Sequence, residues 1–91
     1  MVSQKVSIKN PTGLHLRPAG IFCKTAMQFT SRISVETKSK GDLVIANAKS
    51  VLSILGAAIK AGDEILIICD GEDECLALKA MVAIVEDGLG E

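Results

Sequence analysis

The sequence predicts an α+β fold in which a four-stranded, mainly antiparallel sheet carries three helices on one face. The chain has 91 residues, the length of one domain, and 48% of them are apolar. Apolar residues alternate in four short segments and recur at helical spacing in three others. Their order is strand, helix, strand, strand, helix, strand, helix (βαββαβα). Two right-handed crossovers enclosing a hairpin place the helices together, so the other face of the sheet should meet water.

In the first half, alternation predicts a strand over 5–9, with Val6 and Ile8 on one face and Pro11 ending it. A helix should begin near Pro18, which suits a first helical turn. Its inward face carries small and aromatic residues: Ala19, Phe22, Cys23, Ala26 and Phe29. A hairpin is expected next, with strands over 33–37 and 43–47 and a turn at 38–42.

In the second half, Ser50 should cap a short helix that carries Val51, Leu52 and Leu55. A strand around 65–69 follows, and an acidic cap at 70–74 precedes a last helix that Gly88 ends. The last helix should bury Leu78, Met81, Val82 and Val85, leaving Leu76 and Ile84 partly exposed. If Ile65, Ile67 and Cys69 face the helices, Leu66 and Ile68 face outward, where apolar residues favour a homodimer through the open sheet face.

Composition excludes several function classes. Two aromatic residues and a net charge of −1 leave little for base stacking or phosphate attraction, so no nucleic-acid binding is expected. No apolar stretch reaches the roughly 20 residues of a membrane span, so no membrane insertion is expected. Cys23, Cys69 and Cys75 lack C-x-x-C spacing and are odd in number. Buried or half-buried thiols in a soluble cytoplasmic protein are therefore expected, rather than disulfides or a zinc site.

The candidate site centres on the only histidine of the chain, in Gly13-Leu14-His15-Leu16-Arg17-Pro18-Ala19. His15 falls where a loop becomes a helix, beside backbone N–H groups that favour anions. Arg17 adds a permanent cation whose forked donors suit phosphate oxygens. Gly13 allows close backbone approach. His15 is thus interpreted as a nucleophile that carries a phosphoryl group; the alternative is an ordinary N-cap residue beside a solvated arginine.

This segment resembles the active-site signature of HPr, the phosphocarrier of the bacterial phosphoenolpyruvate-dependent sugar phosphotransferase system. The likeness continues through 47–52, 61–65 and 71–74, and 88–91 is similar to the tails of Gram-positive HPr proteins. The resemblance implies a single HPr-like domain over 1–91, folded as an open-faced β-sandwich.

The resemblance also implies a function. Enzyme I would phosphorylate Nδ1 of His15, assisted by Arg17, and His15 would pass the group to EIIA domains of sugar permeases. Such a chain is a phosphocarrier rather than an enzyme and needs no cofactor or metal. Partner binding is assigned to apolar and basic positions of the first two helices: Leu16, Gly20, Lys24, Lys49, Val51 and Leu52.

Ser50 aligns with the regulatory serine of Gram-positive HPr proteins. The resemblance implies an HPr kinase/phosphorylase acting on Ser50 and a catabolite-control transcription factor as a partner; the alternative is that Ser50 is only a good N-cap. The chain departs from the family pattern in its longer hairpin at 38–42, in Leu16, and in the exchange of glycine between Gly56 and Ala58. These departures leave open an HPr-like paralogue in a specialised phosphorelay, or a regulatory binding protein acting through phospho-Ser50.

Overall fold

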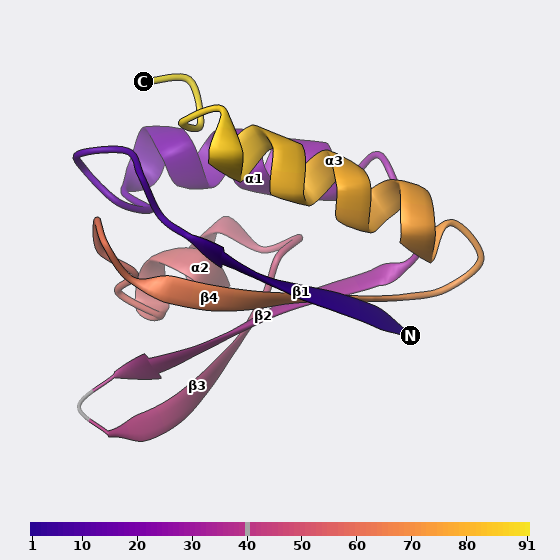
Figure 1. Ribbon diagram of the computed structural model, residues 1–91, viewed down its shortest axis with the longest axis horizontal. Coiled ribbons are helices and arrows are strands. Elements are labelled where there is room, and N and C mark those ends of the chain that lie inside the picture. The colour runs from indigo at the N-terminus through magenta and orange to yellow at the C-terminus, as the bar shows by residue number, and fades with distance from the viewer. Residues whose placement is uncertain (40) are drawn as a thin grey trace.

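The computed structural model, which describes residues 1–39 and 41–91, confirms the predicted element order and the α+β fold (Figure 1). The elements are β1 (Val2–Ser7), α1 (Leu16–Ala26), β2 (Arg32–Ser39), β3 (Asp42–Asn47), α2 (Val51–Gly56), β4 (Glu64–Asp70) and α3 (Glu74–Glu86). The strands form one sheet in the spatial order β1-β4-β2-β3, and every neighbouring pair is antiparallel. Helix α1 packs against both α2 and α3, and Figure 1 shows α1 and α3 side by side over the sheet.

The core follows from the alternation of side chains along the central strands. Ile65, Ile67 and Cys69 of β4 are buried, as predicted, and so are Ile33 and Val35 of β2. Phe22 of α1 is fully buried against this layer. Burying a side chain of that size contributes about 1.5–3 kcal/mol. The alternate positions of these two strands point to the opposite face, which no helix of the described part of the chain covers.

The hairpin turn is shorter than predicted. Lys38 pairs with Leu43, and Ser39 pairs with Asp42, so these residues belong to β2 and β3 and not to a turn over 38–42. Lys40, also placed in that turn, lies outside the described residues. Lys38 and Asp42 are exposed, so cross-strand pairing rather than burial holds these polar residues in the strands.

Two other boundaries differ from the expectation. Strand β1 spans Val2–Ser7 and not 5–9, and Ile8 packs in the core beyond its end. The Ile8 N–H donates to the Asp63 carbonyl (2.8 Å). Helix α1 begins at Leu16, two residues before Pro18. Proline is tolerated there because the first-turn N–H groups have no acceptor within the helix.

The predicted acidic cap of α3 is confirmed in position, with Glu74 in the first turn, but the N-cap side chain bonds elsewhere. Asp73 is the N-cap residue but makes no cap hydrogen bond to its own helix. Its carboxylate instead accepts from the N–H groups of Thr30 and Ser31 (2.9 Å each) and from the Ser31 hydroxyl. These bonds lower the pKa of Asp73 from 3.8 to about 2, the Ser31 hydroxyl bond having the largest effect. Asp73 therefore ties the start of α3 to the turn between α1 and β2.

The expectation for the thiols needs a correction as well. Cys23 and Cys69 are buried, and burial raises the pKa of each, that of Cys69 to about 11. Cys75, in the first turn of α3, is exposed, so it is not one of the buried or half-buried thiols that were expected. Within the described ranges, none of the helices has the length and apolar character to cross a membrane.

Candidate functional site

His15 stands at the start of α1 with its side chain exposed. It is the N-cap residue, in an extended conformation (φ −73°, ψ −176°), and its carbonyl accepts from Ala19 N–H (2.8 Å). Its imidazole makes no cap hydrogen bond. Because Pro18 has no N–H, the first-turn donors beside the ring are those of Leu16 and Arg17. The arrangement offers an exposed nitrogen nucleophile next to two backbone donors.

The loop before His15 is fixed by Gly13. Its φ is +67°, which favours glycine, and an added Cβ would lie 2.7 Å from the Ile59 carbonyl oxygen and 2.8 Å from the Lys60 Cα atom. The next residue, Leu14, is buried and donates its N–H to the same Ile59 oxygen (3.0 Å). The α2–β4 connection thus determines where His15 begins the helix.

A second anchor of this loop was not predicted from the sequence. Glu91 Oε1 accepts from Asn10 Nδ2 (2.9 Å) and from Thr12 Oγ1 (2.7 Å), while Asn10 Nδ2 also donates to the Gly13 carbonyl (2.6 Å). The bonds from Asn10 and Thr12, and the positive charge of Arg17, hold the pKa of Glu91 below its ordinary value. Glu91 is 81 residues from Asn10, so no local pattern could have indicated this contact.

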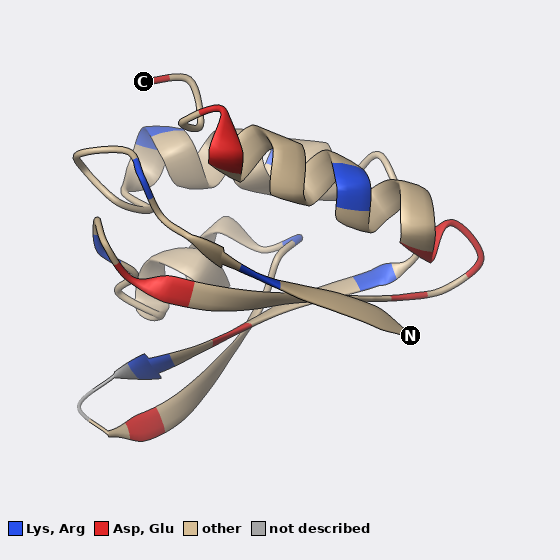
Figure 2. Cartoon of the chain, viewed as in Figure 1, with Lys and Arg blue, Asp and Glu red and all other residues tan. Residues whose placement is uncertain are grey.

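The basic residues assigned to partner binding from the sequence differ in exposure and in hydrogen bonding. Arg17 in the first turn and Lys24 in the last turn of α1 are exposed. Lys49 is half-buried, and its Nζ donates to the Phe29 carbonyl (2.6 Å), so this cation is held between the α1–β2 turn and the start of α2. Figure 2 shows the acidic residues on α3, the strands and the loops, whereas α1 and α2 contain none. The charged side chains of α1 are therefore all cationic, and α2 carries no charged side chain.

Exposed apolar side chains accompany these cations. Leu16 is 69% exposed and Leu52 is 83% exposed, on the two adjacent helices α1 and α2. Val51 is half-buried, and Gly20 leaves open space on α1 where a side chain would stand. Met27, the C-cap residue of α1, is another exposed apolar residue (68%), and the sequence analysis did not single it out. Its position four residues after the buried Cys23, outside the set of inward-facing residues, could have indicated it.

Ser50 caps α2 as predicted. Its Oγ accepts from Ser53 N–H (3.2 Å), and Ser53 Oγ in turn accepts from Asn47 N–H (2.9 Å). Asn47 Oδ1 accepts from Lys49 N–H (2.9 Å). These bonds connect the end of β3 to the first turn of α2, so the Ser50 hydroxyl is already engaged in the fold.

Comparisons with known proteins agree with this architecture. The family model described as "PTS HPr component phosphorylation site" matches residues 2–87. The HPr-like protein Crh of Bacillus subtilis is 39% identical over 96% of this chain and 98% of its own length. The phosphocarrier protein HPr of Lysinibacillus sphaericus is 36% identical over all of both chains. The crystal structure of HPr-C-His from Thermoanaerobacter tengcongensis superposes with a TM-score of 0.87 and 38% identity, covering 100% of this chain and 98% of that one.

Proposed function

The chain belongs to the HPr family of phosphotransferase-system phosphocarriers, and from this premise we propose that it accepts a phosphoryl group on His15 from phosphorylated Enzyme I in the cytoplasm. It then donates that group to EIIA domains of sugar permeases, as a carrier rather than as an enzyme. The observation that carries the proposal is that the imidazole of His15, at the start of α1, is exposed and makes no cap hydrogen bond to the helix. A side chain that caps no helix is available for covalent chemistry.

The chemistry follows from the groups around His15. Its Nδ1 lone pair forms the N–P bond while the bond from phosphorus to the donor breaks. In the second transfer this N–P bond breaks while a nucleophile of EIIA forms its own bond to phosphorus. The transition state needs positioning and charge stabilisation more than covalent assistance. The guanidinium of Arg17 and the N–H groups of Leu16 and Arg17 supply positive charge to the phosphoryl oxygens.

Partner docking is proposed on the surface formed by α1 and α2. Leu16, Val51 and Leu52 supply apolar contact, and Gly20 lets a partner approach α1 closely. The cations that surround these residues are Arg17, Lys24 and Lys49. An apolar centre with a basic rim suits Enzyme I and EIIA surfaces of opposite charge.

We further propose that Ser50 is a regulatory site, modified by an HPr kinase/phosphorylase. A phosphate there retains oxygens that accept from Ser53 N–H, so α2 should stay folded. It also brings about −1.5 to −2 charges beside the basic docking surface, which should weaken acidic partners. The modified surface would serve a catabolite-control transcription factor.

A second candidate is a regulatory role like that implied for HPr-like paralogues, or a place in a specialised phosphorelay. Its support is the 39% identity to an HPr-like protein of the Crh type, somewhat above the 36% identity to HPr of Lysinibacillus sphaericus. The exposed His15 favours the carrier function, because a purely regulatory protein needs no nucleophile at that position.

The test is phosphorylation with phosphoenolpyruvate and purified Enzyme I, followed by intact-mass measurement. We expect one acid-labile phosphoryl group on the native chain and on Ser50→Ala, and none on His15→Ala. Transfer to a purified EIIA domain should then regenerate the unmodified mass. A native chain that gains no phosphoryl group from several Enzyme I preparations would overturn the carrier function and favour the regulatory candidate.

A further inference from the structure

Asn10 is a buried polar residue in the loop that leads to His15, and it is only 3% exposed. It begins a turn over 10–13, in which Gly13 N–H donates to the Asn10 carbonyl (3.2 Å). Pro11 takes the second position of this turn, where its fixed φ is favourable. The side-chain Nδ2 of Asn10 donates in return to the Gly13 carbonyl (2.6 Å). Asn10 therefore holds both the N–H and the carbonyl of Gly13, close before His15.

The two neighbours of Asn10 Nδ2 fix the orientation of its amide. Nδ2 also donates to Glu91 Oε1 (2.9 Å), and this oxygen accepts from Thr12 Oγ1 as well (2.7 Å). A carbonyl and an ionised carboxylate can only accept, so the amide nitrogen, and not its oxygen, must face them. The buried Oδ1 atom has no hydrogen-bond partner among the described residues. Because an unpaired buried acceptor costs free energy, the contribution of this side chain lies in its two donor bonds.

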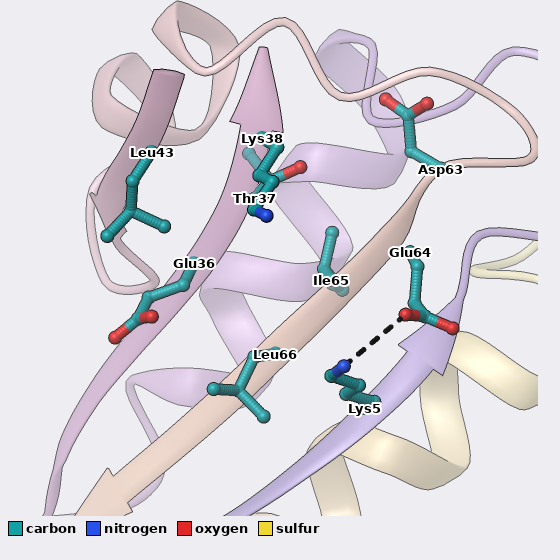
Figure 3. A pocket seen from close by; sticks show the side chains of 9 residues that line it. All are labelled: Lys5, Glu36, Thr37, Lys38, Leu43, Asp63, Glu64, Ile65 and Leu66. Atoms are coloured by element: carbon teal, nitrogen blue, oxygen red, sulfur yellow. Dashed lines mark ion pairs between the residues drawn. The ribbon is translucent and has the colours of Figure 1, made fainter. Parts of the chain in front are cut away.

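The other side of the loop meets a turn that is folded on itself. Leu14 N–H donates to the Ile59 carbonyl (3.0 Å), at the start of the α2–β4 connection. In that connection Lys60 N–H donates to Asp63 Oδ2 (2.9 Å), and Asp63 N–H donates to the Lys60 carbonyl (3.0 Å). Figure 3 shows the Asp63 carboxylate pointing away from the ion pair drawn on the open sheet face, so it supports this turn. The loop is thus held between Asn10 and a fixed turn.

We propose that Asn10 is a positioning residue for phosphoryl transfer through His15, with Glu91 orienting its amide. This inference rests on the carrier function proposed above. The imidazole makes no cap hydrogen bond, so the backbone that enters α1 decides where the ring stands. Transfer requires the attacking nitrogen to be in line with the bond that breaks, and a displacement of about 1 Å can cost about 100-fold in rate. By fixing Gly13, Asn10 fixes that line of attack.

Asn10 and Glu91 belong to neither helix of the docking surface, so they should affect the rate of transfer and not the affinity for Enzyme I. Steady-state phosphorylation by Enzyme I, with this chain as the varied substrate, separates the two. Asn10→Ala should lower kcat about tenfold, with KM within about twofold of the native value. The exposed side chain of Gln4 on β1 gives the matched control, because Gln4→Ala removes an amide far from the loop and should behave as the native chain.

Variants of Glu91 keep the test decisive if the buried Asn10 tolerates substitution poorly, because Glu91 is exposed. Glu91→Ala removes the group that orients the amide and should lower kcat about threefold. Glu91→Gln retains an oxygen that accepts from Asn10 and Thr12, so it should return kcat to within about twofold of the native value. Because Glu91 acts through Asn10, the double alanine variant should be little slower than Asn10→Ala alone.

Two measurements separate positioning from damage to the nucleophile or the fold. Phosphoramidate phosphorylates histidine without a partner protein, so His15 should react equally fast in Asn10→Ala, Glu91→Ala and the native chain. Hydrogen exchange of the Leu14 amide, which donates to the Ile59 carbonyl, should be faster in both variants.

The possible outcomes divide clearly. Native kcat in Asn10→Ala and Glu91→Ala, a raised KM at unchanged kcat, or a slower reaction with phosphoramidate would each overturn the role of Asn10 and leave the carrier function intact. Equal kcat values for Glu91→Gln and Glu91→Ala would overturn the part assigned to Glu91. A native chain that reacts with phosphoramidate but not with Enzyme I would instead overturn the carrier function, and the role of Asn10 in transfer with it.

Discussion

The starts of α1 and α2 present two candidate phosphorylation positions with opposite local structures. His15 and Ser50 are both N-cap residues in extended conformations. Ser50 hydrogen-bonds to its own helix through Ser53 N–H, whereas the ring of His15 makes no cap bond. One side chain therefore contributes to folding, and the other is available for chemistry.

What fixes each helix start differs accordingly. The start of α1 is held from outside, by the close approach of Gly13 to Ile59 and by the hydrogen bonds among Asn10, Thr12 and Glu91. The start of α2 is held from within, by the chain of bonds through Ser50 and Ser53. When neighbouring residues hold the backbone in position, a reactive side chain can be fixed in place without making stabilising hydrogen bonds of its own.

The largest expected effect concerns the external support of α1. Gly13→Ala should destabilise the protein by about 3 kcal/mol, because the left-handed conformation costs about 1–2 kcal/mol and the new Cβ would displace the loop from Ile59. Urea denaturation measures the change. Gly20→Ala, where the Cβ meets open space, is the control and should raise stability by about 0.5–1 kcal/mol. Equal stability of Gly13→Ala and the native chain would contradict this account of the loop.

The start of α3 offers a third case, since Asp73 bonds to a different turn. Its pKa falls from 3.8 unfolded to about 2 folded, so its stabilisation is complete above about pH 4 and is lost as the pH falls toward 2. Asp73→Asn should lower the melting temperature at pH 7 and flatten its decline between pH 4 and pH 2. Circular dichroism melts across this range measure both, with Glu72→Gln as a neighbouring control. An unchanged acid decline in Asp73→Asn would show that other carboxylates cause it.

A smaller effect compares the two caps directly. Ser50→Ala removes a cap hydrogen bond and should cost about 1 kcal/mol of unfolding free energy. His15→Ala removes no such bond, so its unfolding free energy should stay within about 0.5 kcal/mol of the native value. Parallel urea titrations decide the matter. A loss at His15 equal to that at Ser50 would mean that the imidazole also supports its helix.

The sequence predicted those parts of the molecule that depend on neighbouring residues. Helical and alternating periodicity indicated the order of elements, and the His15–Arg17 motif with the Ser50 cap followed from adjacent residues. Contacts between distant segments were missed: Asp73 with Ser31, 42 residues apart, and Glu91 with Asn10. Periodicity carries no information about which turns meet in space. For the same reason the side chain of Asp73 was assigned to its own helix.

An effect of similar size is predicted at the other end of α2. Ala58 follows this helix with φ +52°, a conformation that favours glycine, while Gly56 lies within the helix where a Cβ would meet open space. Exchanging them, Gly56→Ala with Ala58→Gly, should raise stability by about 1 kcal/mol, because each residue would then match its backbone conformation. Urea denaturation of the double and single variants tests this. If both single variants are neutral, the end of α2 is not strained, and its stability depends on Ser50 and the packing of Ile54.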